Sequence, residues 1–383
     1  MKKLNISSYL MRTKWFVLLT IAIFLVVFGR MVETPSLSKS AVVLGIGIDY
    51  DKATSQFEVS AQSVLVGSSS GDTSETSYVC TTAKGNSIAG AMDVISRKTG
   101  LIISLSHCNV LFMSTSAFEL DHMQLIYPLT GMYALPEQTI IVTGDKSPSE
   151  MLSLRIGTTI SSPFFLQQAL VNEEGSDGMI RTTAKDFLAR SLSPSKANVV
   201  PYIVAKTTSP PLSETGGEED VFEFDISRAM VFDERASRIL DNEYAEILAI
   251  YHSHDVTGTL NYTAKDGGTI EFKILKKDVK VKANGRAITA DIKLSADLAD
   301  VQKIKTDEVI TPAYEIVKRY AAALEKDIER RLVEMYELSK QINVDFLSLQ
   351  SKAYQSVGRN LEDDCLSTLT FTPKVTISVR ESG

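Results

Sequence analysis

An uncharged apolar run covers residues 15–29 and continues past Arg30 to Val32. As a helix, residues 15–32 would extend about 27 Å, close to the ~30 Å hydrocarbon core of a bilayer. Trp15 at one end and Arg30 near the other suit the two membrane interfaces. The pattern therefore predicts a transmembrane signal anchor.

Positive charge is concentrated before this run, at Lys2, Lys3, Arg12 and Lys14. By the positive-inside rule, residues 1–14 are expected in the cytoplasm and the body of the protein outside it. Two other interpretations stay open. A cleaved signal peptide would need a small-x-small site, which residues 29–33 do not offer, and a buried core helix would not normally follow four positive charges.

The next part of the chain is dominated by strand patterns. Residues 41–49 form a continuous apolar run typical of a strand buried on both faces, and residues 56–66 alternate at period two, so the pair predicts a hairpin. A helix is predicted at 86–98, ended by Gly100, and a short helix opens at Ser147 and Pro148. Further strands are predicted at 78–82, 101–113, 139–143 and 198–206, the last at a sheet edge or bulge because it contains Pro201.

A polar segment at residues 209–220 with two prolines, two glycines and four carboxylates marks a boundary. After it, apolar residues that recur every four positions predict a long amphipathic helix over 307–342. Strands are predicted at 227–232, 255–262, 269–281, 287–298 and 369–379, with hairpin turns at 266–268 and at Asn284-Gly285.

These elements predict an α+β fold. A transmembrane helix at 15–32 is followed by a mixed α/β domain at 41–206, a linker at 207–224, and a second domain at 225–383. The second domain is expected to be an antiparallel sheet with the long amphipathic helix laid across it.

Charge and cysteine content limit the partners. Lys and Arg number 40 against 47 Asp and Glu, a net charge of -7, and no basic stripe is present, so nucleic acid is not expected as a partner. Three scattered cysteines, Cys80, Cys108 and Cys365, are too few for a disulfide framework and favour free thiols. One disulfide stays open for an exported body.

Few residues suggest catalysis or metal binding. Gly45 and Gly47 lack the third glycine and the following helix of a dinucleotide site, so close backbone packing explains them better. His252, His254 and Asp255 are the best metal candidate, without a further His or Cys nearby.

Two more candidates are weaker still. His107 and Cys108 would point to opposite strand faces, although a thiol nucleophile needs its base within reach. The carboxylate pairs Asp49 with Asp51 and Asp363 with Asp364 suit turns. We therefore predict no catalytic, cofactor or metal site, and no enzyme.

An ordered series of segments resembles the Ger(x)C family, the GerAC-like C subunits of bacterial spore germinant receptors. The segments are AVVLGIGIDYD (41–51), FEVSAQSV (57–64), TTAKGNSIAGAMDVISRKTG (81–100), LSHCNVLFMS (105–114), SRAMVFDE (227–234) and VTISVRESG (375–383). The resemblance covers residues 41–383. It implies several mixed α/β domains without a known catalytic centre.

The resemblance also implies a place and partners. The protein would stand on the outer face of the spore inner membrane beside A-type and B-type receptor subunits and would be required for nutrient-triggered germination. Family members usually carry a lipobox cysteine for lipid attachment, but residues 29–40 contain none, so the transmembrane anchor would tether the chain. A scaffold of another envelope or sporulation assembly, and an extracytoplasmic enzyme or metal-binding protein, are the alternatives.

Overall fold

The structure is a computed structural model. It describes residues 15, 17, 19–24, 40–64, 78–156, 160–171, 179–208, 221–252, 258–263, 268–302, 313–358 and 365–380. The chain forms two compact units, Met1–Ser40 and Ala41–Gly383.

In the first unit, the described residues between 15 and 24 are helical, and their apolar side chains are exposed. No helix within the described residues has both the length and the apolar character to cross a bilayer. Positions 16, 18 and 25–32 of the predicted anchor lie outside the described residues.

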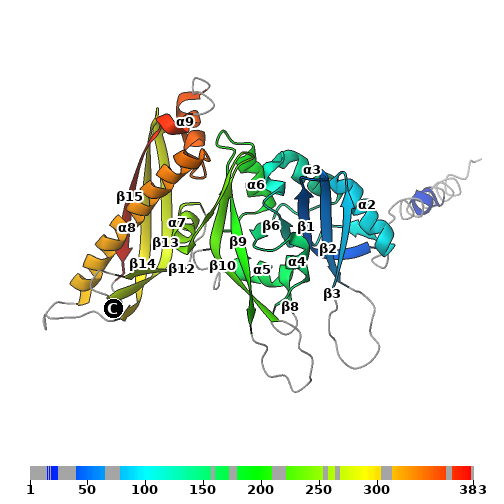
Figure 1. Cartoon of the computed structure of the whole chain (residues 1–383), viewed down its shortest axis with the longest axis horizontal. Coiled ribbons are helices and arrows are strands. Elements are labelled where there is room, and N and C mark those ends of the chain that lie inside the picture. Colours follow the sequence, from blue (N-terminus) through cyan, green and yellow to red (C-terminus); the bar gives the residue numbers. More distant parts are fainter. Residues whose placement is uncertain are drawn as a thin grey trace, which may run out of the picture. The chain divides into compact units, whose positions relative to one another are not determined.

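Strand β1 (Ser40–Asp51) is central to the first sheet of the second unit. It pairs antiparallel with β2 (Gln56–Val64), which confirms the predicted hairpin, and parallel with β5 (Val110–Met113). The strand order is β3-β2-β1-β5-β6-β9-β10-β7-β8, with β4 on β1 and β11 on β10 (Figure 1). The remaining strands are β3 (Tyr78–Gly85), β4 (Ile102–Ser104), β6 (Ile140–Gly144), β7 (Arg155–Ile156), β8 (Ile160–Ser161), β9 (Asn198–Thr208), β10 (Val221–Phe232) and β11 (Ser237–Leu240).

Helices cover both faces of this sheet. In β5, Val110 and Phe112 belong to one core, while Leu111 and Met113 belong to another. The first core includes side chains of α4 (Pro148–Ser153) and α5 (Ser162–Val171), and the second those of α2 (Ile88–Thr99), α3 (His122–Met132) and α6 (Ala184–Ser191). Burial on both sides explains why these strands are continuously apolar.

Glycines on β1 let two helices approach the sheet closely. A Cβ on Gly45 would overlap Cγ of Pro163 in α5, and one on Gly47 would lie 2.8 Å from Cβ of Pro148 in α4. The predicted role of these glycines in close packing is thus supported by the geometry.

The predicted helix ends also match. Gly100 ends α2 in the left-handed conformation with φ 69°. Ser147 caps α4 through a reciprocal capping box with Glu150, and Pro148 occupies its first turn.

The second sheet has the order β12-β13-β14-β15, formed by β12 (Gly258–Thr263), β13 (Thr269–Asn284), β14 (Ala287–Gln302) and β15 (Thr370–Val379). The prediction of an antiparallel sheet is wrong at one pair, because β15 runs parallel to β14. The chain between them contains α8 (Ala313–Ile342) and α9 (Leu349–Val357), and such a helical crossover returns a strand in the same direction.

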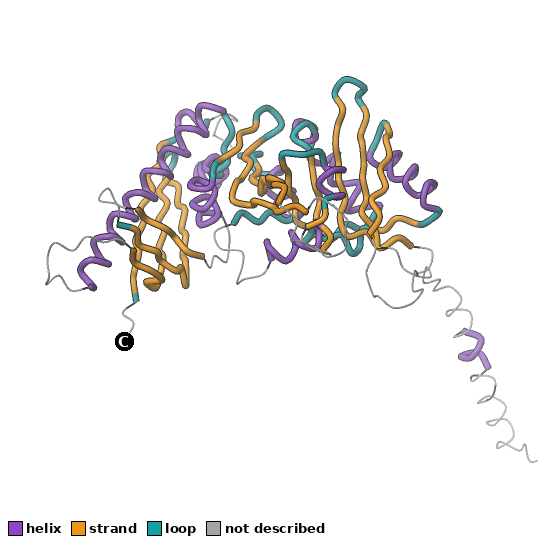
Figure 2. Tube along the Cα trace, turned by 60° about the horizontal axis from the view of Figure 1, so that its bottom comes forward, coloured by secondary structure: helices purple, strands orange, loops and turns teal. Residues whose placement is uncertain are grey.

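Helix α8 lies along the second sheet (Figure 2). The predicted four-residue repeat is confirmed: Tyr320, Leu324, Ile328, Leu332 and Tyr336 are all buried. The predicted first residues of this helix, 307–312, lie outside the described residues.

One further strand prediction differs from the structure. The strand predicted at 101–113 is two strands, because a turn closed by the Cys108 N–H on the Leu105 carbonyl at 2.8 Å separates β4 from β5. For the strand with Pro201, the predicted edge position is wrong, because β9 lies between β6 and β10. The predicted alternative, a bulge, is supported by the register shift between Asp225 and Arg228 in the ladder that β9 forms with β10. Both ends of the predicted linker at 207–224 are strand residues, in β9 and β10, and residues 209–220 lie outside the described residues.

Candidate functional site

His252, from the candidate metal group that the sequence disfavours, has a structural role. His252 is the last residue of α7 (Asn242–His252), and its Nε2 lies 2.6 Å from the Phe346 carbonyl oxygen. Burial, helped by the positive charge of Arg190, lowers the pKa of His252 to about 3. His254 and Asp255 lie outside the described residues, and within the described ranges no three His, Cys, Asp or Glu side chains form a group that could hold a metal.

The three cysteines are buried or partly buried. The Cys108 thiol donates to the Val110 carbonyl at 3.4 Å, and burial raises its pKa to about 12, so it stays a protonated, unreactive thiol. His107 beside it is exposed in the turn. Cys80 and Cys108 are free, and the buried Cys365 thiol lies 3.7 Å from Oε1 of Gln350.

The carboxylate pair on β1 stabilises local backbone. Asp49 accepts hydrogen bonds from its neighbour Tyr50 N–H at 2.8 Å and from the Ser116 hydroxyl at 3.2 Å. Asp51 accepts from the Ala53 N–H and the Thr54 hydroxyl, which closes the turn into β2. Asp363 and Asp364 lie outside the described residues.

Sequence reasoning missed a serine–histidine contact between α3 and α6. Ser191 Oγ lies 2.9 Å from Nδ1 of His122, whose Nε2 lies 3.0 Å from the Phe118 carbonyl oxygen. Burial lowers the pKa of His122, and its ring is 4.9 Å from that of Phe187 and 5.7 Å from that of Phe232. The pair therefore ties two helices together inside an aromatic core; no sequence signal joins residues 69 positions apart.

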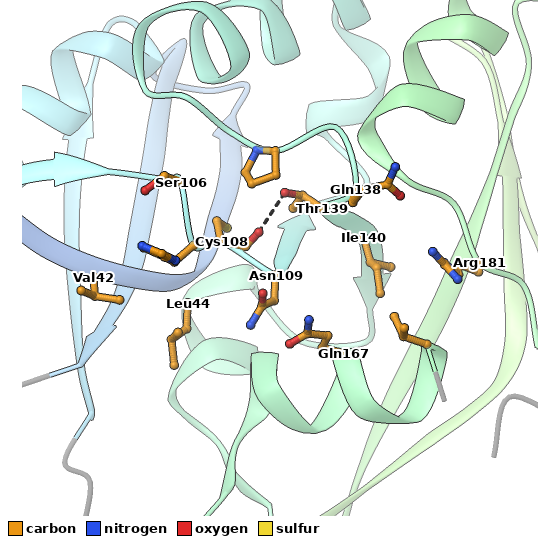
Figure 3. A pocket seen from close by; sticks show the side chains of 13 residues that line it. Val42, Leu44, Ser106, Cys108, Asn109, Gln138, Thr139, Ile140, Gln167 and Arg181 are labelled. Carbon is orange, nitrogen blue, oxygen red and sulfur yellow. Dashed lines mark hydrogen bonds between the residues drawn. The ribbon is translucent and has the colours of Figure 1, made fainter. Parts of the chain in front are cut away.

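A cavity of about 580 Å³ opens at the amino-terminal ends of three parallel strands, β1, β5 and β6 (Figure 3). Apolar side chains from β1, β6 and α5 form part of its wall: Val42, Leu44, Ile140 and Val171. Its volume is in the range of small-molecule sites.

Polar side chains enter the same cavity from separate elements. Asn109 precedes β5, Gln167 comes from α5, and Arg181 comes from the segment before α6. In Figure 3 the amides of Asn109 and Gln167 point toward one another, and the guanidinium of Arg181 points inward. The lining residues, all in the described part of the chain, include no carboxylate.

A buried polar junction joins the α6–β9 loop to the start of α9. Asp345 Oδ2 accepts hydrogen bonds from the Ser195 hydroxyl at 2.6 Å and the Gln350 N–H at 2.7 Å, and Oδ1 accepts from the Leu349 N–H at 2.9 Å. Ser195 Oγ also lies 2.7 Å from the Ser351 hydroxyl. The junction thus links segments about 150 residues apart within one compact unit.

Comparisons with known proteins agree with this architecture. Residues 35–205 match the model described as "Spore germination protein N-terminal domain", and residues 227–383 match "Spore germination B3/ GerAC like, C-terminal". A crystal structure of the GerBC protein superposes with a TM-score of 0.51 at 14% identity, covering 89% of this chain and 99% of that one. At that identity the likeness concerns the fold. No curated protein sequence matches the chain significantly.

Proposed function

We propose, from the premise that this chain belongs to the Ger(x)C (GerAC-like) family of spore germination proteins, that it is the C-type subunit of a spore germinant receptor. The family provides non-catalytic subunits of germinant receptor complexes. In this proposal the protein is required for nutrient-triggered germination and acts by contacts with A-type and B-type membrane subunits. The observation that carries the proposal is the match of both family domains, in order, over residues 35–205 and 227–383.

In the proposed mechanism the protein acts by binding the membrane subunits and not by catalysing a reaction. The unit Ala41–Gly383 is compact, and its buried junction at Asp345 holds distant segments in one arrangement. A rigid body of this kind can present fixed surfaces to membrane subunits, which favours binding because little conformational entropy is lost on docking.

We further propose that residues 15–32 anchor this body to the spore inner membrane, with residues 1–14 in the cytoplasm. The support is the apolar run and the preceding charges at Lys2, Lys3, Arg12 and Lys14. A single cysteine introduced at Ser40, in a chain with its three natural cysteines replaced, should react with a membrane-impermeant maleimide from the outer side. Labelling only after the membrane is permeabilised would contradict this topology.

The function is tested by deleting the gene in its spore-forming host. Spores should lose the response to nutrients but keep germination by agents that act downstream of the receptors. Restoring the gene in a second location should return the nutrient response. A normal nutrient response in a deletion strain without other receptor operons would refute the proposal.

A scaffold role in another envelope or sporulation assembly is the second candidate. It is favoured by the absence of a lipobox cysteine from residues 29–40. Affinity purification of the full chain from spore membranes distinguishes the two functions. Recovery of A-type and B-type subunits supports the receptor, and their absence beside other envelope proteins supports the scaffold.

A further inference from the structure

We propose that the cavity at the amino-terminal ends of β1, β5 and β6 binds a small monocarboxylate with an apolar body. The inference goes beyond the proposed function, which requires no ligand in this domain. It rests on the charge of the lining, the polar groups that lack partners, and the apolar wall.

The charge of the lining selects an anion. The protein as a whole has more Asp and Glu than Lys and Arg, 47 against 40, yet among the residues that the structure describes no carboxylate lines this cavity, whereas Arg181 does. Among these described lining residues a cationic ligand would find no counter-charge. The ammonium of a zwitterionic amino acid would lack a partner among the same residues. Its binding would be disfavoured, because desolvating a charge without a partner is costly.

The polar groups are available for a ligand. Within the described part of the chain, the side chains of Asn109, Gln167 and Arg181 make no hydrogen bond or ion pair with protein; Asn109 and Gln167 are half-buried, and Arg181 is exposed. Arginine presents a planar fork that matches the two oxygens of a carboxylate. The two amides, which come from opposite sides in Figure 3, can donate to or accept from a second polar group.

The surroundings favour a monoanion over a phosphate. Only one guanidinium lines the cavity, and α5 contributes Gln167 and Val171 from its carboxyl-terminal half. The helix dipole is negative at that end, so it opposes a dianion more strongly than a monoanion. Val42, Leu44 and Ile140 offer an apolar wall for a hydrocarbon portion, whose burial adds affinity in proportion to the area removed from water.

Calorimetric titration of the full chain in detergent tests the proposal. The probes are acetate, butyrate, hexanoate and benzoate, with hexanol, hexylamine and inorganic phosphate as comparisons. We expect saturable binding of the larger carboxylates only, tightening from acetate to hexanoate. Hexanol binding as tightly as hexanoate overturns the proposal. So does the absence of any saturable carboxylate binding with a Kd below about 10 mM, which corresponds to a binding free energy of about 2.7 kcal/mol.

Variants connect the binding to the cavity. Arg181→Gln should weaken hexanoate binding at least tenfold, and Gln167→Leu should weaken it less because the guanidinium remains. The matched control is Arg97→Gln, which removes an exposed arginine from α2, outside the cavity lining. Unfolding curves of all three should show intact folding. Equal affinity in Arg181→Gln and Arg97→Gln overturns the proposal even where carboxylates bind.

Discussion

Asp345 is a carboxylate with almost no contact with water, since its side chain is 1% exposed. Burial raises the pKa of Asp345 to about 6, against the opposing effect of the Ser195 hydroxyl and the backbone N–H groups of Gln350 and Leu349. The folded protein therefore binds this proton more tightly than the unfolded chain does. The resulting stabilisation is fully present below pH 3.8 and is lost as the pH rises through about 6.

This shift predicts a pH dependence that an asparagine removes. Between pH 5 and pH 8, the free energy of unfolding of the natural protein should fall by about 1–2 kcal/mol relative to that of Asp345→Asn. Urea unfolding of both proteins at several pH values measures the difference directly. Parallel pH profiles would show that Asp345 titrates as an ordinary exposed carboxylate.

A single methyl group at Gly45 should be enough to disturb the packing of α5 on β1. Its Cβ would overlap Cγ of Pro163 and lie 2.9 Å from Cδ2 of Leu152. Overpacking of this kind costs about 1–3 kcal/mol, so Gly45→Ala should lower the free energy of unfolding by that amount.

The matched control for this change is Gly131→Ala on α3. A Cβ at Gly131 meets nothing within 4 Å, and alanine favours a helix over glycine. Gly131→Ala should therefore leave stability unchanged or raise it by up to about 1 kcal/mol. A loss in both variants would mean that the glycines matter for another reason than contact.

At the scale of elements, α8 protects one edge of the second sheet, that of β15. Glu329 accepts the Val375 N–H at 2.9 Å, and Glu325 accepts the Ile377 N–H at 2.6 Å. Strand β15 is the last strand of its sheet, so these carboxylates bind N–H groups that another chain could otherwise pair with.

Removing both carboxylates should destabilise this edge. Glu325→Ala with Glu329→Ala should cost about 1–3 kcal/mol and increase aggregation, because two backbone donors lose their acceptors. Glu337→Ala is the control, since Glu337, whose side chain is 53% exposed, pairs with Lys340 on the same helix, a contact worth under about 1 kcal/mol. Thermal unfolding and light scattering record both effects; equal behaviour of the two variants would contradict the edge role.

Elements with a strong local pattern were predictable from sequence. The four-residue repeat located α8, and Gly100 and Ser147 marked helix ends. Helix α7 was missed because its residues are buried on most sides: Ile247, Leu248 and Ile250 all lie in the core, which leaves no amphipathic period.

Features that depend on distant residues had no local signal. The parallel direction of β15 is set by the crossover through α8 and α9 and not by its own alternation. Likewise, Asp345 and Ser195 are 150 positions apart, and Arg181 joins Asn109 and Gln167 only after the sheet has formed. Their juxtaposition follows from strand order, which periodicity does not encode.

At the scale of the whole molecule, β10 contributes residues to three cores of the described part of the chain, and its Ile226 lies in the one with α4 and α5. Met230 and Phe232 lie in the core with α2 and α3, while Ala229 and Val231 lie in the core that includes α7, α8 and the second sheet. The same strand pairs with β9 along its length. The predicted division into domains at 41–206 and 225–383 would place residues 225–232 of β10 with the second domain alone, and it stays a prediction.

This shared strand predicts how fragments behave. A fragment of residues 41–206 lacks β10, so the edge of β9 and part of a core are open to water, and it should aggregate. A fragment of residues 41–252 keeps β10 and covers its other face with α7, so it should be more soluble but melt below the body at 41–383. That body should unfold in one cooperative transition, because each core contains residues of β10. Size-exclusion chromatography and calorimetry test this prediction. If the 41–206 fragment is monomeric and stable, or if 41–383 unfolds in two separate transitions, the two halves fold independently. Strand β10 then does not couple their stabilities.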